Sequence, residues 1–231
     1  MKAILALDTT TNACSVALWN DGVIIASRYE EMIRGHAERL VPMVKEITDE
    51  AEYPVKAVNL VAVTVGPGAF TGVRIGLATA RGFALSAGVP CQGLTTLEVI
   101  AASLPAASVR SLVAIDSKRE DIYFQIFESD GVRCTDAAIA APEQVSLIAA
   151  KHIPVGGHII LAGDGALAVS ERLADIGIES EISCVQYPHA SVLAELAAKR
   201  WLSGNPMMRA KPFYLRSPDA ALPVSGGSLR P

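Results

Sequence analysis

Two stretches of the chain share one pattern of apolar runs, acidic residues and turns. They cover residues 4–22 and 112–131, and each opens with an apolar run that ends in an aspartate, Asp8 or Asp116. A hydroxyl residue, a polar turn, a second apolar run and an Asp-Gly dipeptide follow each aspartate. Asp-Gly between apolar runs is a strong hairpin signal, because glycine adopts positive φ at little cost. The pattern predicts an internally duplicated α/β protein whose halves each open with a three-stranded meander.

The rest of the chain alternates between strand and helix patterns. Leu40, Met43, Val44 and Ile47 recur at helical spacing, so we expect a helix that starts near Pro42 or bends there. The third strands of the two meanders are expected at residues 23–31 and 132–137, and further strands at 57–66, 89–95 and 158–162. Further helices are expected at residues 71–87, 96–104, 141–152, 167–176 and 189–202.

We expect two lobes, over residues 1–104 and 105–216, with a boundary near the Pro-Ala-Ala-Ser segment at 105–108. Residues 217–231 are rich in proline, glycine and serine, which is typical of a flexible tail. Whether the last helix, over residues 189–202, packs back on the first lobe is left open by the pattern.

The glycine-rich stretch from Thr64 to Gly88 raises the main question. It is no phosphate loop, because Val73 stands where that motif requires lysine, and the dinucleotide fingerprint fails because Thr71 replaces its third glycine. We expect a helix with Thr71 as N-cap and Gly88 at its C-terminal stop. Small residues follow at four-residue spacing along this helix: Gly72, Gly76, Ala80 and Ala84. Such a stripe lets another backbone approach closely, either from a second protein or from the chain's own sheet.

Composition excludes several function classes. The net charge is −4 and basic residues are scattered, so we do not expect this chain alone to bind RNA tightly. No apolar run approaches the roughly 18 residues of a membrane span, and no secretory signal is expected, so the predicted location is cytoplasmic. The cysteines lack metal-ligand or redox spacing, and we interpret them as small apolar residues.

Several motifs together resemble one known family. "LALDTTTNACSVAL", "GPGAFTGVRIGLATARGFA", "VAIDSKREDIYFQIF" and "KPFYLR" are similar to the TsaB family, also called YeaZ. The resemblance covers the chain up to about residue 216. It implies the duplicated actin-like and sugar-kinase (ASKHA) fold, an α/β fold of two lobes, each with a mixed sheet flanked by helices.

The resemblance also implies a role in making N6-threonylcarbamoyladenosine at position 37 of tRNA. TsaB-like proteins are regarded as scaffolds that pair with the catalytic paralogue TsaD and work with the ATPase TsaE, meeting tRNA only through the complex. We therefore expect no catalytic residue, no metal and no cofactor, with nucleotide bound, if at all, at an interface shared with TsaD. A homodimer is expected when the chain is isolated.

Two sites of related enzymes can be compared with this sequence. TsaD-like enzymes hold a metal through two histidines four residues apart on a helix; here His36 is followed by Leu40, which cannot bind a metal. Superfamily kinases bind nucleotide at strand ends and glycine turns. The equivalent positions form a candidate degenerate nucleotide site: Asp8, Thr9, Thr10, Asp116, Gly163 and Gly165.

The predicted partner interface combines the small stripe with apolar neighbours from the two helices. Its residues are Leu40, Met43, Val44, Gly72, Val73, Arg74, Gly76, Leu77, Ala80 and Ala84. Three other hypotheses stay open. The chain could be an ATP-binding or ATP-hydrolysing enzyme of the same superfamily, or a glycoprotease-like metalloprotease, which the missing second histidine disfavours. The third is a plain structural domain without a partner, which the helix glycines Gly76 and Gly82 disfavour.

Overall fold

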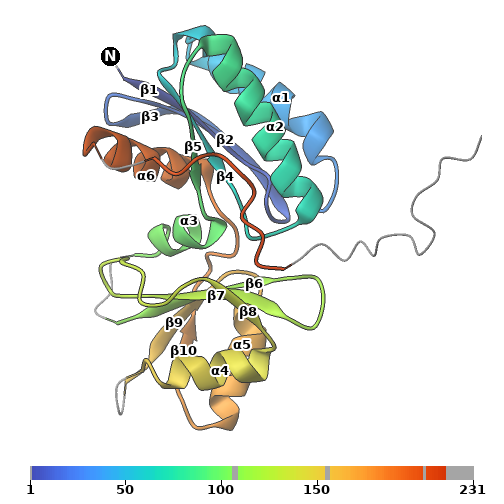
Figure 1. The fold of residues 1–231 in the computed structure, drawn as a ribbon, viewed down its shortest axis with the longest axis vertical. Helices are drawn as coiled ribbons and strands as arrows, with labels where there is room; N and C mark the ends of the chain where they lie inside the picture. Colours follow the sequence, from blue (N-terminus) through green and yellow to red (C-terminus); the bar gives the residue numbers. More distant parts are fainter. Residues whose placement is uncertain (1, 106–108, 154–156, 205–206, 217–231) are drawn as a thin grey trace, which may run out of the picture.

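The computed structural model describes residues 2–105, 109–153, 157–204 and 207–216, which form two lobes (Figure 1). Each lobe is built on a five-stranded mixed sheet. The strands of the first sheet are β1 (Ala3–Asp8), β2 (Ala13–Asn20), β3 (Val23–Glu31), β4 (Leu60–Thr64) and β5 (Cys91–Leu94). Those of the second are β6 (Ser111–Asp116), β7 (Ile122–Phe127), β8 (Ala138–Ala140), β9 (Ile159–Ala162) and β10 (Ser180–Ile182).

The two sheets have the same topology. The first has the order β3-β2-β1-β4-β5, and the second has the equivalent order β8-β7-β6-β9-β10. In each sheet the first three strands pair antiparallel, and the fourth and fifth join them in parallel. The predicted internal duplication is confirmed by this shared order.

Helices cover both faces of each sheet (Figure 1). They are α1 (His36–Glu50), α2 (Phe70–Ala87), α3 (Thr96–Ala102), α4 (Pro142–Ala150), α5 (Ala166–Asp175) and α6 (Ala190–Leu202), with a 3-10 turn at Val55–Ala57. Alternate residues of β1 point to opposite faces, so Leu5 and Leu7 meet α1 and α2, while Ile4 and Ala6 meet α6. Helix α6 therefore packs back on the first lobe, and α3 lies between the lobes against the second sheet.

The structure corrects several predicted boundaries. Helix α1 begins at His36 and runs through Pro42, an exposed residue, because its other side is fastened to the core. Helix α2 has Ala69 rather than Thr71 at its N-cap, with no side-chain cap, while Gly88 ends it with a φ of 69° as predicted. The third strand of the second lobe is β8, later than the predicted 132–137, because Cys134 and its neighbours instead bond to the end of β7. The predicted tail at 217–231 lies outside the described residues.

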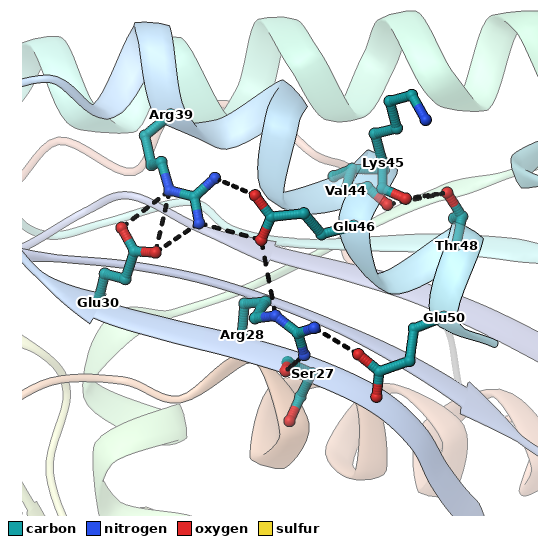
Figure 2. Close-up of polar contacts among 9 residues, drawn as sticks. All are labelled: Ser27, Arg28, Glu30, Arg39, Val44, Lys45, Glu46, Thr48 and Glu50. Atoms are coloured by element: carbon teal, nitrogen blue, oxygen red, sulfur yellow. Dashed lines mark hydrogen bonds and ion pairs between the residues drawn. The ribbon is translucent and has the colours of Figure 1, made fainter.

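Charged side chains fasten α1 to β3 (Figure 2). Arg39 of α1 donates hydrogen bonds to Glu30 of β3 and to Glu46, and Arg28 of β3 forms ion pairs with Glu46 and Glu50. These side chains are between 27% and 49% exposed, so solvent screens them and the free energy of each pair is small. The network fixes the orientation of α1 more than it stabilises the fold.

After α6 the chain returns along the first lobe. Gly93 of β5 donates to the Met208 carbonyl, and Phe213 donates to the Val65 carbonyl, each over 2.8 Å. The segment ends with an ion pair between Arg216 and Asp121, which lies in the β6–β7 turn of the second lobe. Residues 208–216, which end in the "KPFYLR" motif, thus cover the β5 edge and link the two lobes.

Glu98 of α3 joins elements from both lobes. Its Oε1 accepts hydrogen bonds from Arg200 of α6 and from Arg133, at 2.6 Å for the latter, and its Oε2 accepts from Thr95 in a capping box. Burial raises the pKa of Glu98, but the charge of Arg200 and the hydrogen bonds from Thr95, Arg200 and Arg133 outweigh it and hold the pKa at about 2. The Glu98 side chain is 6% exposed, but Arg133 is 51% exposed, so solvent screens the pair that reaches the second lobe more than the pair with Arg200.

We expect Glu98→Gln to destabilise the chain by about 1–2 kcal/mol near pH 7, because two guanidinium groups lose their carboxylate while solvent screens the half-exposed Arg133. The folded-state pKa is lowered from 4.5, so the contribution is fully present above that value and is lost as the pH falls toward about 2. Urea denaturation of both proteins across this range measures it. Glu195→Gln on the exposed face of α6 is the matched control. Equal losses in both variants, or a loss independent of pH, would contradict the assignment.

Candidate functional site

The glycine-rich loop before α2, over residues 65–69, and the first turn of α2 pack directly on the turn between β1 and β2. A Cβ atom at Gly68 would lie 2.2 Å from the Thr10 carbonyl oxygen, and one at Gly72 would lie 2.0 Å from the Thr9 carbonyl oxygen. The backbone N–H of Ala69 donates to the Thr10 carbonyl over 2.8 Å, and the Thr9 hydroxyl donates to the Gly72 carbonyl over 2.7 Å. These glycines are therefore required for contact between two backbone segments of the same chain.

The small stripe of α2 faces inward, which corrects the predicted partner interface. A Cβ atom at Gly76 would lie 2.7 Å from the Thr9 hydroxyl oxygen, and Ala80 and Ala84 are buried in the core shared with the first sheet. The same core buries the apolar residues assigned to the interface: Leu40, Met43, Val44, Val73 and Leu77. The prediction that this ridge meets a neighbouring subunit is wrong for these residues, because the chain's own sheet and α1 already cover them.

The opposite side of the same two helices is exposed. We define the outer α1–α2 face by Ala37, Val41, Phe70, Arg74, Ala78, Gly82 and Leu85. Leu85 is 85% exposed and Val41 is 50% exposed, so both helices present apolar surface on this side. Arg74, the one predicted interface residue on this face, lies over the Phe70 ring at 3.7 Å and donates to the Tyr214 hydroxyl.

Gly82 lies on the outer α1–α2 face without a structural need for glycine. No atom lies within 4 Å of the place where its Cβ would be, apart from the helix's own backbone. Glycine inside a helix costs about 0.5–1 kcal/mol relative to alanine. The contacts within this chain explain Gly72 and Gly76 but leave Gly82 unexplained. The sequence marks Gly82 as a helix glycine that needs a compensating interaction, but the four-residue spacing left Ala78 and Gly82 out of the predicted interface.

Asp8 is enclosed at the end of β1. Its Oδ1 accepts hydrogen bonds from the hydroxyls of Thr10 and Thr64, at 2.7 and 2.5 Å, and from the Thr10 N–H. Burial raises the pKa of Asp8 from 3.8 to about 6, although these hydrogen bonds lower it. Asp8, Thr9 and Thr10 are each 0% exposed, so the structure brings these three candidate nucleotide residues together but leaves them no access to solvent.

The remaining candidate nucleotide residues meet at the end of β6 in the second lobe. Gly163 packs on β6, where an added Cβ would lie 2.0 Å from the Ala114 carbonyl oxygen, and Gly165 lies beside the Asp116 N–H. The ammonium group of Lys118 lies 3.2 Å from Asp116 Oδ2 and 2.9 Å from Asp164 Oδ2. The sequence did not assign Lys118 or Asp164 to this cluster.

A cleft of about 320 Å³ opens beside this cluster, lined by Lys118, Gly163, Asp164, Leu167 and Tyr187. Unlike the first hairpin, this side of the second lobe is accessible. Its chemistry is mixed, because the lysine is paired with carboxylates that would repel a phosphate.

His36 has a structural contact. Its Nε2–H donates to the Thr11 carbonyl over 3.0 Å, and Leu40, one turn later, is fully buried. Within the part of the chain that the structure describes, no group of three or more His, Cys, Asp or Glu side chains could hold a metal ion. In the same residues, no helix is both long and apolar enough to cross a membrane.

Comparison with known proteins identifies the family. The family model described as tRNA N6-adenosine threonylcarbamoyltransferase, TsaD, matches residues 24–222. The Escherichia coli K12 protein named tRNA threonylcarbamoyladenosine biosynthesis protein TsaB is 33% identical over 222 residues, which cover 93% of this chain and 94% of that protein. The chain belongs to the TsaB family.

Solved structures agree with this assignment. A Pseudomonas aeruginosa protein described by its similarity to the peptidase YeaZ has a TM-score of 0.80 and 33% identity, and the match covers 94% of this chain and 100% of that one. Component A of (R)-2-hydroxyglutaryl-CoA dehydratase from Acidaminococcus fermentans is 12% identical, with a TM-score of 0.51 over 87% of this chain and 99% of that one. The second likeness concerns the fold alone, which is the duplicated actin-like and sugar-kinase (ASKHA) fold.

We expect the two sides of α2 to respond in opposite directions to the same substitution. Gly72→Ala should lower the free energy of unfolding by about 1–3 kcal/mol, because the new methyl group overlaps the Thr9 backbone. Gly82→Ala should raise it by about 0.5–1 kcal/mol, because alanine favours the helix and the space is open. Urea denaturation of the isolated variants gives both values, and effects of the same sign would contradict the assignment of the two sides.

Proposed function

We propose that the chain is a scaffold subunit of the complex that makes N6-threonylcarbamoyladenosine at position 37 of tRNA. In this proposal it pairs with TsaD and TsaE in the cytoplasm, contacts tRNA only through the complex and contributes no catalytic group, metal or cofactor. The names of its relatives support the pathway. The observation that carries the scaffold role is the exposed outer α1–α2 face, with an unexplained helix glycine between apolar side chains.

The outer α1–α2 face has the properties of a helix-on-helix docking surface. Ala78 and Gly82 are one helical turn apart, so a partner helix can approach the α2 backbone closely there. Leu85 and Val41 flank this strip and supply apolar surface that is exposed in the isolated chain. Phe70 and Arg74 extend it at the other end of α2, and arginine and aromatic residues are enriched at binding hot spots.

TsaD is the proposed partner in the cell, because it shares the family model and would present equivalent helices. A second copy of the chain would present the same face under two-fold symmetry, and pairing of the two faces would give the homodimer expected for the isolated protein. Any nucleotide would bind at an interface shared with TsaD.

The enclosure of Asp8 supports the absence of independent chemistry. In this fold a phosphate would have to reach the β1–β2 hairpin, and the glycine loop lies on that hairpin at hydrogen-bond distance. One observation favours the alternative of an ATP-binding enzyme: the accessible cleft beside Asp116, Gly163 and Gly165. No comparable observation among the described residues favours a metalloprotease.

We expect Gly82→Leu and Leu85→Arg each to abolish both co-purification with TsaD and self-association. The new bulk or charge would then stand on the outer α1–α2 face where a partner helix is proposed to pack. Both positions are exposed, so the unfolding midpoint should stay within about 3 °C of the parent chain. Size-exclusion chromatography of co-expressed proteins gives the readout. Leu147→Arg on α4, a side chain that is 55% exposed, is the matched control. If the α2 variants still pair as the control does, this surface is misplaced.

We expect the isolated chain to show no ATP turnover above buffer. Asp8→Asn should leave threonylcarbamoyladenosine formation by the reconstituted TsaD and TsaE mixture within about twofold, because a group without access to solvent takes no direct part in the reaction. Phosphate release and tRNA modification assays measure both quantities. Turnover by the isolated chain that Asp8→Asn removes would favour the enzyme alternative instead.

A further inference from the structure

A second accessible cleft, of about 490 Å³, lies on the α6 side of the first sheet. It is formed by the end of β3, the end of α3, the segment before α6 and the first turn of α6. The side chains that define its chemistry are Tyr29, Glu31, Gln186, Tyr187 and His189. The cleft and the outer α1–α2 face lie on opposite faces of the sheet, so the inference is independent of the proposed function.

A stacked ring pair forms one wall of the cleft. The Tyr29 and His189 rings are 5.1 Å apart at their centroids and 9° from parallel. His189 Nδ1 accepts a hydrogen bond from the Ser191 N–H at the start of α6, which places the ring proton on Nε2. Burial lowers the pKa of His189, so the ring is neutral at neutral pH. The outer face of this stacked pair is therefore a flat, uncharged aromatic surface.

The other groups give the cleft a negative character. Glu31 is exposed, and its Oε1 accepts a long hydrogen bond of 3.4 Å from the Tyr29 hydroxyl. Tyr187 adds a second phenol ring, and no lysine or arginine is among the described residues that line the cleft. A phosphate or carboxylate ligand would find no cation here, and the negative carboxylate would repel it.

We propose that this cleft binds a guanidinium group, which stacks on the Tyr29–His189 wall and pairs with the Glu31 carboxylate. A guanidinium ion is planar, weakly hydrated and carries parallel N–H groups, so it matches a flat aromatic wall next to a carboxylate. An ammonium ion lacks the planar surface, and a neutral nucleobase gains nothing from the carboxylate's charge. The guanidinium can belong to an arginine side chain of a partner protein or to a small guanidino compound.

The test uses the full chain and three matched ligands. N-acetylarginine amide carries the guanidinium, N-acetylcitrulline amide replaces it with a neutral group of the same shape, and N-acetyllysine amide carries an ammonium. Backbone amide chemical-shift titrations report both affinity and position. We expect the arginine amide to shift the resonances of residues that line the cleft. The citrulline amide should bind at least about tenfold more weakly, which is a difference in binding free energy of about 1.4 kcal/mol.

Two variants test which side chains of the cleft hold the guanidinium group. Glu31→Gln should weaken binding of N-acetylarginine amide about tenfold, while Glu38→Gln, an equal change of charge at an exposed position on α1, should not. Tyr187→Leu should also weaken it, with an unchanged unfolding midpoint as the check on folding.

Three further ligands distinguish the two sources of the guanidinium group and test a nucleoside as the alternative occupant. Tighter binding of a capped Gly-Arg-Gly peptide than of free arginine would support a partner's side chain, and the reverse order would support a small guanidino compound. The proposal is overturned if arginine and citrulline amides bind equally, if neither shifts the cleft, or if adenosine binds there in preference to both.

Discussion

The arrangement of the first lobe depends on the contact between the N-terminus of α2 and the β1–β2 hairpin. Two glycines bring the loop before α2 and the first turn of α2 against the carbonyls of Thr9 and Thr10, closer than any side chain would allow. The contact closes the space over Asp8 at the end of β1, one of the residues assigned to the candidate nucleotide site. It also sets the rotation of α2, and so decides which residues of that helix remain on the surface.

The two lobes share a topology but close their strand ends differently. In the first lobe, backbone atoms cover the hairpin and leave a buried carboxylate with a raised pKa. In the second lobe, Lys118 bridges Asp116 and Asp164 at the surface, and a cleft remains beside them. Glu98 and the C-terminal segment join the lobes through charged contacts. Duplication thus preserved the sheet order while the chemistry of the two halves diverged.

Much of the fold follows from the sequence because its signals are local. The Asp-Gly turns, the apolar runs and the helix-ending Gly88 each act on neighbouring residues, so pattern alone predicts the duplicated sheets. Short strands such as β8 and β10 depend on pairing with distant segments, and the pattern misplaced the first and missed the second. Pro42 was tolerated inside α1 because the buried side of that helix outweighs the lost hydrogen bond.

The candidate site shows where sequence reasoning reaches its limit. Small residues every four positions indicate a close approach, but they do not say which backbone approaches. Here Gly76 and Ala80 meet the chain's own sheet, whereas Gly82, outside that stripe, is the glycine without an internal contact. Only the neighbours in space separate the two, just as only folding brings Tyr29 next to His189.

The central claim is that the inner side of α2 serves the fold and its outer side serves a partner. The most direct measurement is the alkylation rate of the new thiol in Ala78→Cys, located by mass spectrometry, with and without an excess of TsaD. The account predicts a fall in rate of about tenfold or more on adding TsaD, with no such change for a thiol introduced by Leu147→Cys on α4. An unchanged rate at position 78 in a complex that has formed would contradict it.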